Sequence, residues 1–318
     1  MNLDELFNKK LVVVTGKGGV GKTTVSLALS YLNSRFDRDS IYVTLNEIKK
    51  DSYFFGFNTG INSREKALDN NLWSVAIDPN TALKEYVREN FVNLYPVYAT
   101  ILKSKTLQNF FEAAPGLMEL ITIGKVWHLG NRNPQGRKSR KAYDQVIFDA
   151  PSTGHAIPIL DLPSRVLDMV RGGAFKSHIG WVESFLKDPD QAAVVVVATP
   201  EEMVVRETIE LIDSVKSLGI NVIFTVVNNA YEKMFDKKEV SIIKELLTEN
   251  KGAEISPAVE LAFSHAARTR MSEKYTKKLR KELKEPVLII HKRYKRDLAV
   301  RDLKSISSEL RNQLDKSL

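Results

Sequence analysis

The sequence predicts an α/β fold built on a doubly wound, mostly parallel sheet, and three observations support this prediction. Short apolar segments of strand length alternate with longer segments in which apolar residues recur every three or four positions. Residues 193–199 include four consecutive valines, which is typical of a parallel strand buried on both faces. Several strands end at a glycine or a polar residue, and ligands of such sheets bind beyond those ends.

Composition limits the class of protein further. The chain has 318 residues, of which 43% are apolar, and this is enough for one large α/β domain. It contains no cysteine, which excludes disulfides, thiolate metal sites and cysteine nucleophiles. The longest apolar run, 192–198, is far shorter than the ~20 residues that span a bilayer, and the first ten residues do not resemble a signal sequence. We therefore expect a soluble, cytoplasmic protein.

The most informative segment is 16–24, Gly-Lys-Gly-Gly-Val-Gly-Lys-Thr-Thr. It matches the phosphate-loop pattern of two glycines five positions apart followed by Lys and Ser or Thr. An apolar strand at 11–14 precedes it and a helical pattern follows it, which is the context that the motif requires. The residues expected to bind nucleotide here are Gly16, Lys17, Gly18, Gly19, Val20, Gly21, Lys22, Thr23 and Thr24. The fold is therefore expected to be that of a P-loop NTPase.

The chemistry of this loop follows from its residue types. Glycines allow successive backbone N–H groups to turn toward a phosphate, and the helix that begins near Gly21 adds the positive end of its dipole. Lys22 can reach the outer phosphates of ATP, and the Thr23 hydroxyl can bind Mg²⁺. Thr24 is expected to contact the inner phosphate.

The other elements are expected in alternating order along the chain. Strands are predicted at 40–46, 72–78, 143–150, 193–199, 221–228 and 287–290, and helices at 81–129, 162–186, 201–218, 240–247, 258–284 and 298–314. Pro96 and Pro115-Gly116 should divide the first long helical stretch, and Gly172-Gly173 the second. We expect residues 1–318 to form a single P-loop ATPase domain, with helical insertions at about 80–130 and 155–186 that form a subdomain above the nucleotide.

A second part of the site is expected at the end of the 143–150 strand. Asp149 ends this strand downstream of the phosphate loop, where a carboxylate commonly holds Mg²⁺ through water. The alternative is that Asp149 only caps the turn that follows it. The segment that follows contains Gly154, whose backbone can adopt conformations that other residues disfavour. His155 beside it could have a functional role or could simply pack and form hydrogen bonds.

Several segments resemble one known family. The loop with its extra Lys17 resembles the deviant Walker A loop of the dimeric ATPases that include arsenite-pump, tail-anchored-protein targeting and cell-division positioning ATPases. Asp-Ala-Pro-Ser-Thr-Gly-His at 149–155 resembles the second switch of the first two groups, and 73–86, 113–120, 198–203 and 225–229 resemble further segments of them. The likeness therefore covers nearly the whole chain.

The resemblance implies a dimeric, magnesium-dependent ATP hydrolase. In that family the extra lysine reaches the phosphates of the partner subunit, so Lys17 is expected to do so here; the alternative is a solvated loop lysine. Gly154 would sense the terminal phosphate. Asn228 lies where the family uses a strand-end Asn on adenine, and its alternative role is that of a turn residue.

Two departures from the family pattern limit this inference. Family members place an Asp at the end of the second strand to orient or deprotonate the attacking water, whereas this chain has Asn46, followed by Glu47. An amide can hydrogen-bond a water but cannot act as a base, so we expect slow hydrolysis, with Glu47 as a possible substitute. Without cysteine, neither an arsenite site nor a zinc-bridged dimer can form.

The partner is less well specified by the sequence. The helical insertions could line a groove for an apolar client helix, or their apolar residues could be the core of the subdomain itself. The residues concerned are Tyr98, Ile101, Phe110, Phe111, Leu117, Met118, Val126, Trp127, Met169, Phe175, Trp181 and Phe185. From Arg268 onward the chain has 16 Lys and Arg against 7 Asp and Glu. These charges could cover a packed stripe of Met271, Tyr275, Leu279 and Leu283, or meet an anionic membrane or acidic partner; we do not expect nucleic acid.

Two functions from different classes remain. The first is a dimeric, ATP-driven switch that hydrolyses ATP slowly and acts on a hydrophobic protein client or a membrane-associated partner. The second is a nucleotide-binding regulatory or scaffold subunit with little hydrolysis, which could form a heterodimer with a related ATPase that supplies the missing Asp. The intact loop and second switch favour the first function, and Asn46 favours the second.

Overall fold

The fold is an α/β fold with a mostly parallel sheet, as the sequence predicts. The computed structural model describes residues 3–45, 47, 56–57, 60–90, 116–132, 142–249, 257–295 and 297–315. Within these ranges eight strands form one sheet in the order β3-β4-β2-β5-β1-β6-β7-β8. The strands are β1 (Leu11–Gly16), β2 (Ser40–Thr44), β3 (Lys66–Asp69), β4 (Leu72–Ala76), β5 (Gln145–Asp149), β6 (Ala192–Ala198), β7 (Val222–Ala230) and β8 (Val287–His291). Only β3 pairs antiparallel, so the carboxyl ends of the other strands meet at one edge of the sheet.

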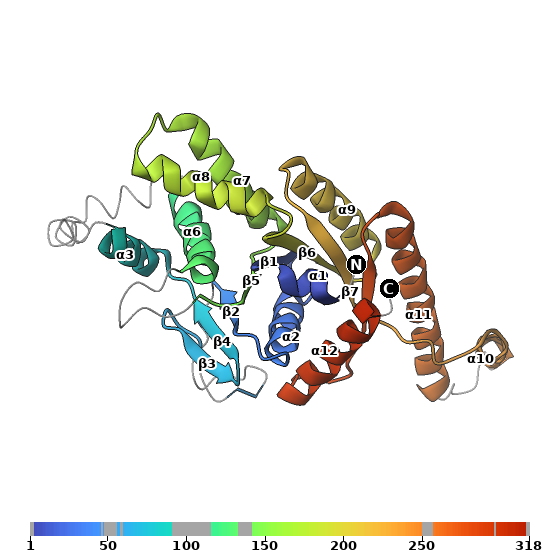
Figure 1. Ribbon diagram of the computed structural model, residues 1–318. Helices are drawn as coiled ribbons and strands as arrows, with labels where there is room; N and C mark the ends of the chain where they lie inside the picture. The colour runs from blue at the N-terminus through green and yellow to red at the C-terminus, as the bar shows by residue number, and fades with distance from the viewer. Residues whose placement is uncertain are drawn as a thin grey trace.

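Helices cover both faces of this sheet (Figure 1). They are α1 (Leu3–Asn8), α2 (Lys22–Ser34), α3 (Pro79–Asn90), α6 (Leu117–Asn131), α7 (Thr153–Met169), α8 (Ala174–Lys187), α9 (Glu202–Ser217), α10 (Lys237–Glu249), α11 (Pro257–Glu282) and α12 (Val300–Asp315). Helices α6, α7 and α8 pack on one another, and α3 packs on α6. None of the helices in the described ranges is both long and apolar enough to cross a bilayer.

The four consecutive valines of β6 show why the sheet needs cover on both faces. Val195 and Val197 join a core that includes side chains of α1, α2 and α12, whereas Val194 and Val196 join a core that includes side chains of α6, α7, α8 and α9. All four valines are fully buried. Alternate side chains of a strand point to opposite faces, so an uninterrupted apolar run requires two apolar environments.

The sequence prediction missed three features of the chain. Helix α1 and strand β3 are too short for a clear periodic pattern. Helix α7 begins at Thr153 rather than near residue 162, and it contains Pro158 and Pro163, which obscured its helical pattern. Residues 91–115 of the helical stretch expected over 81–129, including Pro96, lie outside the described residues.

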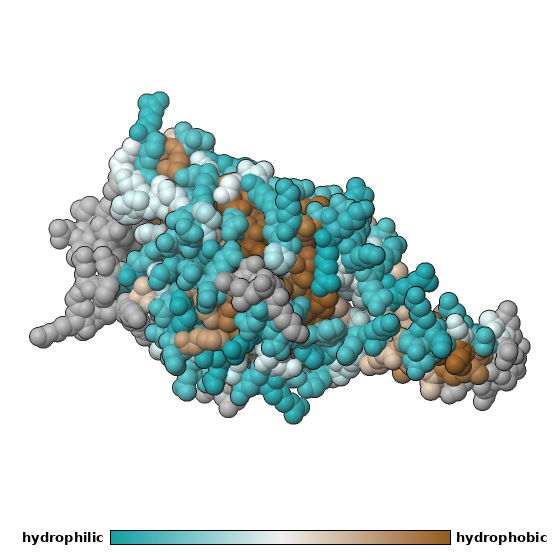
Figure 2. Space-filling model, turned by 45° about the vertical axis from the view of Figure 1, so that its right-hand side comes forward, coloured by the Kyte–Doolittle hydropathy of each residue, from teal (hydrophilic) through white to brown (hydrophobic). Residues whose placement is uncertain are grey.

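Helix α10 and the beginning of α11 contact each other and form a projection from the body of the molecule, whereas the rest of α11 packs on α9, β7 and β8 (Figure 2). Apolar atoms gather on this projection, where Ile242 is 55% and Leu261 72% exposed. The apolar stripe predicted for α11 is partly confirmed. Tyr275 and Leu279 are buried, but Met271 is 47% exposed. Packing therefore covers only part of the stripe.

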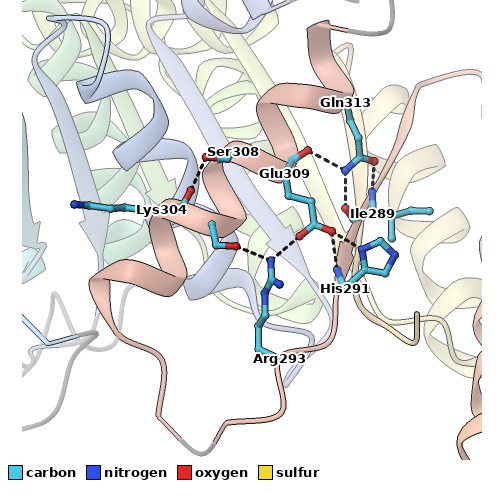
Figure 3. Close-up of polar contacts among 8 residues, drawn as sticks. Ile289, His291, Arg293, Lys304, Ser308, Glu309 and Gln313 are labelled. Atoms are coloured by element: carbon cyan, nitrogen blue, oxygen red, sulfur yellow. Dashed lines mark hydrogen bonds and ion pairs between the residues drawn. The ribbon is translucent and has the colours of Figure 1, made fainter. Parts of the chain in front are cut away.

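Helix α12 covers the open edge of the sheet at β8 (Figure 3). Gln313 accepts a hydrogen bond from the Ile289 N–H at 2.8 Å and donates one to the Ile289 carbonyl at 2.7 Å. The His291 N–H donates to Glu309 Oε1 at 3.2 Å. These side chains occupy backbone groups that an edge strand would otherwise leave unpaired, and an unpaired edge is a site for association with other chains.

The same helix stabilises the helix that follows the phosphate loop. Ser307 donates a buried hydrogen bond of 2.7 Å to the Ala28 carbonyl of α2. Ile306 and Leu310 lie in the same apolar core as Val25 and Leu29 of α2. Residues near the end of the chain therefore support the helix at the candidate site.

We predict that Gln313→Ala lowers the free energy of unfolding by about 1–2 kcal/mol, because two backbone groups of Ile289 lose their side-chain partner. Asn312→Ala, at the exposed neighbouring position of α12, should change it by less than about 0.5 kcal/mol. Urea denaturation of both variants measures the difference. Equal stabilities of the two variants would contradict the role assigned to Gln313.

Candidate nucleotide-binding site

The glycine-rich loop lies between β1 and α2, at the carboxyl edge of the sheet. At Gly16, φ is +151°, and a Cβ atom there would lie 2.2 Å from the Val197 carbonyl oxygen. Gly16 is therefore required by the close contact of β1 with β6. Gly21 occupies the N-cap of α2. Its φ of +91° lies in the left-handed region of backbone conformation, which favours glycine. The loop consequently ends at the N-terminus of a 13-residue helix, where backbone N–H groups are available to an anion.

The loop is fixed to the protein at one end and exposed in the middle. Val20 is buried and its carbonyl accepts a hydrogen bond of 2.8 Å from Asn228 Nδ2, whereas Gly18 and Gly19 are exposed. Lys22 Nζ donates to the Lys17 carbonyl at 3.2 Å, across the loop. Burial lowers the pKa of Lys22, and the negative charge of Asp149 opposes that shift. An anion in the loop would thus meet a partly desolvated ammonium group.

Asp149 lies at the end of β5, and its carboxylate is surrounded by hydroxyl groups. Thr23 Oγ1 and Tyr42 Oη donate to its Oδ2 at 2.7 and 2.8 Å, and Ser26 Oγ donates to its Oδ1 at 3.3 Å. Burial raises the pKa of Asp149, and these hydrogen bonds together with the charge of Lys22 oppose that rise. Burial and the Asp149 carboxylate raise the pKa of Tyr42 well above its ordinary value, so its hydroxyl stays protonated and donates.

The donor set suits magnesium better than a transition metal. Thr23 and Asp149 provide hard oxygen donors in hydrogen-bond contact at the end of the loop. Mg²⁺ typically keeps several waters and takes only one or two protein oxygens besides substrate phosphates. Among the described residues there is no group of three or more His, Cys, Asp or Glu side chains placed to hold a metal. The residues present therefore fit a magnesium ion that nucleotide phosphates help to bind.

Lys17, the extra lysine of the loop, forms an ion pair within the chain. Its Nζ lies 2.6 Å from Glu207 Oε1 of α9, and the two side chains are 39% and 37% exposed. Exposed pairs of this kind typically contribute no more than ~1 kcal/mol, so the contact can be exchanged for another anion at small cost. The sequence did not single out Glu207, because its partner is 190 positions away along the chain.

Asn228 lies at the carboxyl end of β7 and is 6% exposed. Its amide nitrogen donates to the Val20 carbonyl, and a Cβ atom on Gly21 would lie 2.2 Å from that nitrogen. Asn228 is thus brought to the phosphate loop, with its amide group supporting the loop backbone. The contact with adenine that the resemblance implies remains a prediction.

The segment expected to sense the terminal phosphate begins α7. Gly154 and His155 are exposed in its first turn, and a Cβ atom on Gly154 would have no neighbour within 4 Å. Pro158 has no N–H, so the Gly154 carbonyl lacks its usual helical partner four residues later. Glu47 is exposed, while Asn46 lies outside the described residues.

A polar aromatic cluster at the ends of β7 and β8 was also missed from the sequence. Arg268 and Lys292 donate to the Tyr231 hydroxyl at 2.9 and 2.8 Å, and the Tyr294 ring lies 6.4 Å from the Tyr231 ring. Burial raises the pKa of Tyr231, but the hydrogen bonds and charges of Lys292 and Arg268 outweigh it and lower the pKa overall. No local motif marks this cluster, because it joins residues from three separate segments.

The apolar residues of the helical insertions divide into two groups. Val126 and Phe185 are buried, as expected of a core, whereas Met169 is 81% and Trp181 54% exposed. The Trp127 and Trp181 rings stack with centroids 6.4 Å apart. Of the other candidates for a client groove, Leu117 and Met118 are half-buried. Tyr98, Ile101, Phe110, Phe111 and the side chain of Phe175 lie outside the described part of the chain.

Comparison with known proteins identifies the family of the chain. The chain is similar to the ATPase GET3 of Kluyveromyces lactis, with 26% identity over 259 residues, 71% of this chain and 73% of that protein. It is also similar to the ATPase BagA of Mycobacterium tuberculosis, with 27% identity over 225 residues, 69% of this chain and 64% of that protein. The family model described as anion-transporting ATPase matches residues 9–172 and 170–251, which together exceed half of the chain. The chain therefore belongs to the anion-transporting ATPase family and is an ATPase.

Proposed function

We propose that this protein is an ATP-driven switch that binds MgATP, closes as a dimer, hydrolyses ATP slowly and acts on an apolar protein segment or a membrane-associated partner. The observation that carries the proposal is the contact of Thr23 Oγ1 with Asp149 Oδ2 at 2.7 Å, at the N-terminus of α2. This contact joins the two oxygen donors of a magnesium site directly beside a loop whose backbone and Lys22 can bind phosphates.

The proposed binding mode assigns one task to each part of the loop. The backbone N–H groups from Gly16 to Thr24 bind the phosphates, and Lys22 Nζ turns from the Lys17 carbonyl to the outer phosphates. Thr23 and Asp149 hold the magnesium ion, which when bound neutralises phosphate charge. Gly154, whose carbonyl lacks the usual helical partner at Pro158, senses the terminal phosphate by a change of backbone conformation.

Lys17 is proposed to act between two subunits. Its half-exposed ammonium group is held by Glu207, which is close to it in the same chain. In the closed dimer Lys17 would leave Glu207 and contact the phosphates bound by the partner subunit. A triphosphate carries more negative charge than one carboxylate, and charge-assisted contacts with phosphate are among the stronger polar contacts. Nucleotide therefore favours the closed form.

A second function is favoured by Asn46, which stands where the resemblance leads us to expect an Asp. With an amide in place of a base, the protein would bind ATP without efficient turnover and serve as a regulatory or scaffold subunit. Such a subunit could pair with a related ATPase that supplies the carboxylate. Binding of nucleotide is common to both functions, and the rate of hydrolysis distinguishes them.

The apolar client is proposed to bind at the exposed aromatic and thioether side chains of α7 and α8. Met169 and Trp181 are both exposed, and Trp181 stacks on Trp127 of α6. A flexible thioether and flat indole rings are suited to packing against varied apolar side chains. Buried Val126 and Phe185 form the core below them.

We predict that Lys22→Met and Lys17→Met separate nucleotide binding from dimer closure. Lys22→Met should weaken ATP binding by about 10–100-fold, because a charge-assisted contact with the phosphates is lost. Lys17→Met should leave binding within about twofold and should abolish ATP-dependent self-association, since exposed charges contribute little within one subunit. Fluorescent-nucleotide titration and analytical ultracentrifugation measure the two effects.

Glu207→Gln is the matched control for Lys17→Met, because it breaks the same ion pair but keeps the lysine. Self-association of Glu207→Gln in ATP should equal or exceed that of the unaltered protein. If Lys17→Met self-associates normally, Lys17 does not act between subunits. If Lys22→Met binds ATP normally, the loop does not bind the phosphates.

We also predict that a photo-reactive amino acid at Met169 cross-links a leucine-rich helical peptide of about 20 residues when ATP is bound. The control is the same amino acid at Leu261, which is 72% exposed but lies on α11. Gel analysis of the cross-linked products measures the difference. Cross-linking at both positions, or at neither, would contradict a client surface on α7 and α8.

A further inference from the structure

Asp149 has one hydroxyl neighbour that the phosphate-loop motif does not explain. Thr23 and Ser26 belong to α2, directly after the loop, whereas Tyr42 belongs to β2. The Tyr42 hydroxyl donates 2.8 Å to Oδ2, the oxygen atom that also accepts the Thr23 hydroxyl. Hydrogen bonds from β2 as well as from α2 therefore fix the orientation of the Asp149 carboxylate.

Sheet register explains how the phenol reaches this carboxylate. Tyr42 is paired with Ile147 of β5, so Asp149 is its diagonal neighbour two residues further along that strand and on the same face. Diagonal neighbours on adjacent strands lie farther apart than directly paired residues, so an aromatic side chain can reach across where a short polar one cannot. The hydroxyl at the far end of the tyrosine ring is thus what closes this distance.

The ring itself is held firmly in place. Tyr42 is 1% exposed and packs in an apolar cluster with Leu27 and Tyr31 of α2 and Leu72 of β4. A tightly packed ring has little freedom to move its hydroxyl. The hydroxyl can therefore act as a fixed donor, which a solvent molecule or a long flexible side chain cannot do.

Tyr42 also links the carboxylate to a second functional segment. It lies in β2, two residues before the end of that strand, and the strand leads to Asn46 and Glu47. Asp149 ends β5 and is followed by the segment that contains Gly154. The phenol thus connects the strand that precedes the first switch to the carboxylate that precedes the second.

We propose that Tyr42 is a positioning residue that orients the Asp149 carboxylate for magnesium. This proposal rests on the proposed function, in which Asp149 and Thr23 hold the ion. Without the Tyr42 hydroxyl, Thr23 is the one donor left of the two that contact Oδ2, so the carboxylate would be held less firmly in the orientation in which it would hold magnesium. Partners of this kind, one step removed from the metal, commonly change affinity by 10–100-fold.

The test compares Tyr42→Phe with Tyr275→Phe. Tyr275 is 2% exposed as a residue and its hydroxyl donates 2.9 Å to Glu202 Oε2, so its variant removes the phenol oxygen of another buried tyrosine, from a contact between α11 and α9. For each protein, the dissociation constant of a fluorescent ATP analogue is measured in EDTA and over a series of Mg²⁺ concentrations. The thermal midpoint without nucleotide is measured as well.

For Tyr42→Phe we expect the half-saturating Mg²⁺ concentration to rise about tenfold, with the dissociation constant in EDTA unchanged. Tyr275→Phe should leave both values unchanged. A shift of the same factor in EDTA and in Mg²⁺, or no shift, would overturn the positioning role. If unaltered protein binds the analogue equally well in EDTA and in Mg²⁺, the magnesium site of the proposed function fails instead.

A double-mutant cycle with Asp149→Asn keeps the test decisive if Tyr42→Phe also lowers stability. Because Tyr42 acts through Asp149, Tyr42→Phe should cause no further change in Mg²⁺ dependence when Asp149 is already Asn. A purely structural Tyr42 would weaken nucleotide binding by the same factor in both backgrounds, which would contradict the proposal.

Discussion

The carboxylate of Asp149, with three hydroxyl groups around it, is the interaction on which the rest of the site depends. It joins the end of β5, the first turns of α2 and the middle of β2 through contacts to Thr23, Ser26 and Tyr42. Burying a carboxylate without hydrogen-bond donors costs folding free energy, and the three hydroxyl groups reduce that cost for Asp149. Helix α2, which carries two of these hydroxyl groups, is in turn held by α12, since Ser307 donates a hydrogen bond to the Ala28 carbonyl.

Most of the fold could be predicted because its signals are local. The run of valines in β6 requires two apolar faces, and the structure gives it both. Helix α7 shows where local signals fail, because Pro158 and Pro163 hide a helix that tertiary packing nevertheless forms. The edge contacts of Gln313 with Ile289 could not be foreseen either, since they depend on how α12 lies against β8.

The residues of the candidate site also divide into those that the sequence marks and those that only the tertiary structure reveals. The loop residues and Asp149 stand out from the sequence because each follows an apolar strand, and the structure brings Thr23 and Asp149 into contact. Tyr42 and Glu207 do not stand out, because their importance depends on strand register and on the packing of α9 against the loop. The available signal was a tyrosine between Ile41 and Val43 in the middle of a predicted buried strand, because a buried phenol needs a hydrogen-bond partner.

We propose that this protein holds ATP firmly and that the amide of Asn46 limits its hydrolysis. The most direct measurement is phosphate release under single-turnover conditions by the unaltered protein and by Asn46→Asp, with nucleotide affinity measured in parallel. Restoring a carboxylate should raise the rate by about 10²-fold or more, as expected for a general base, and leave affinity within about twofold. Equal rates for the two proteins would contradict the claim.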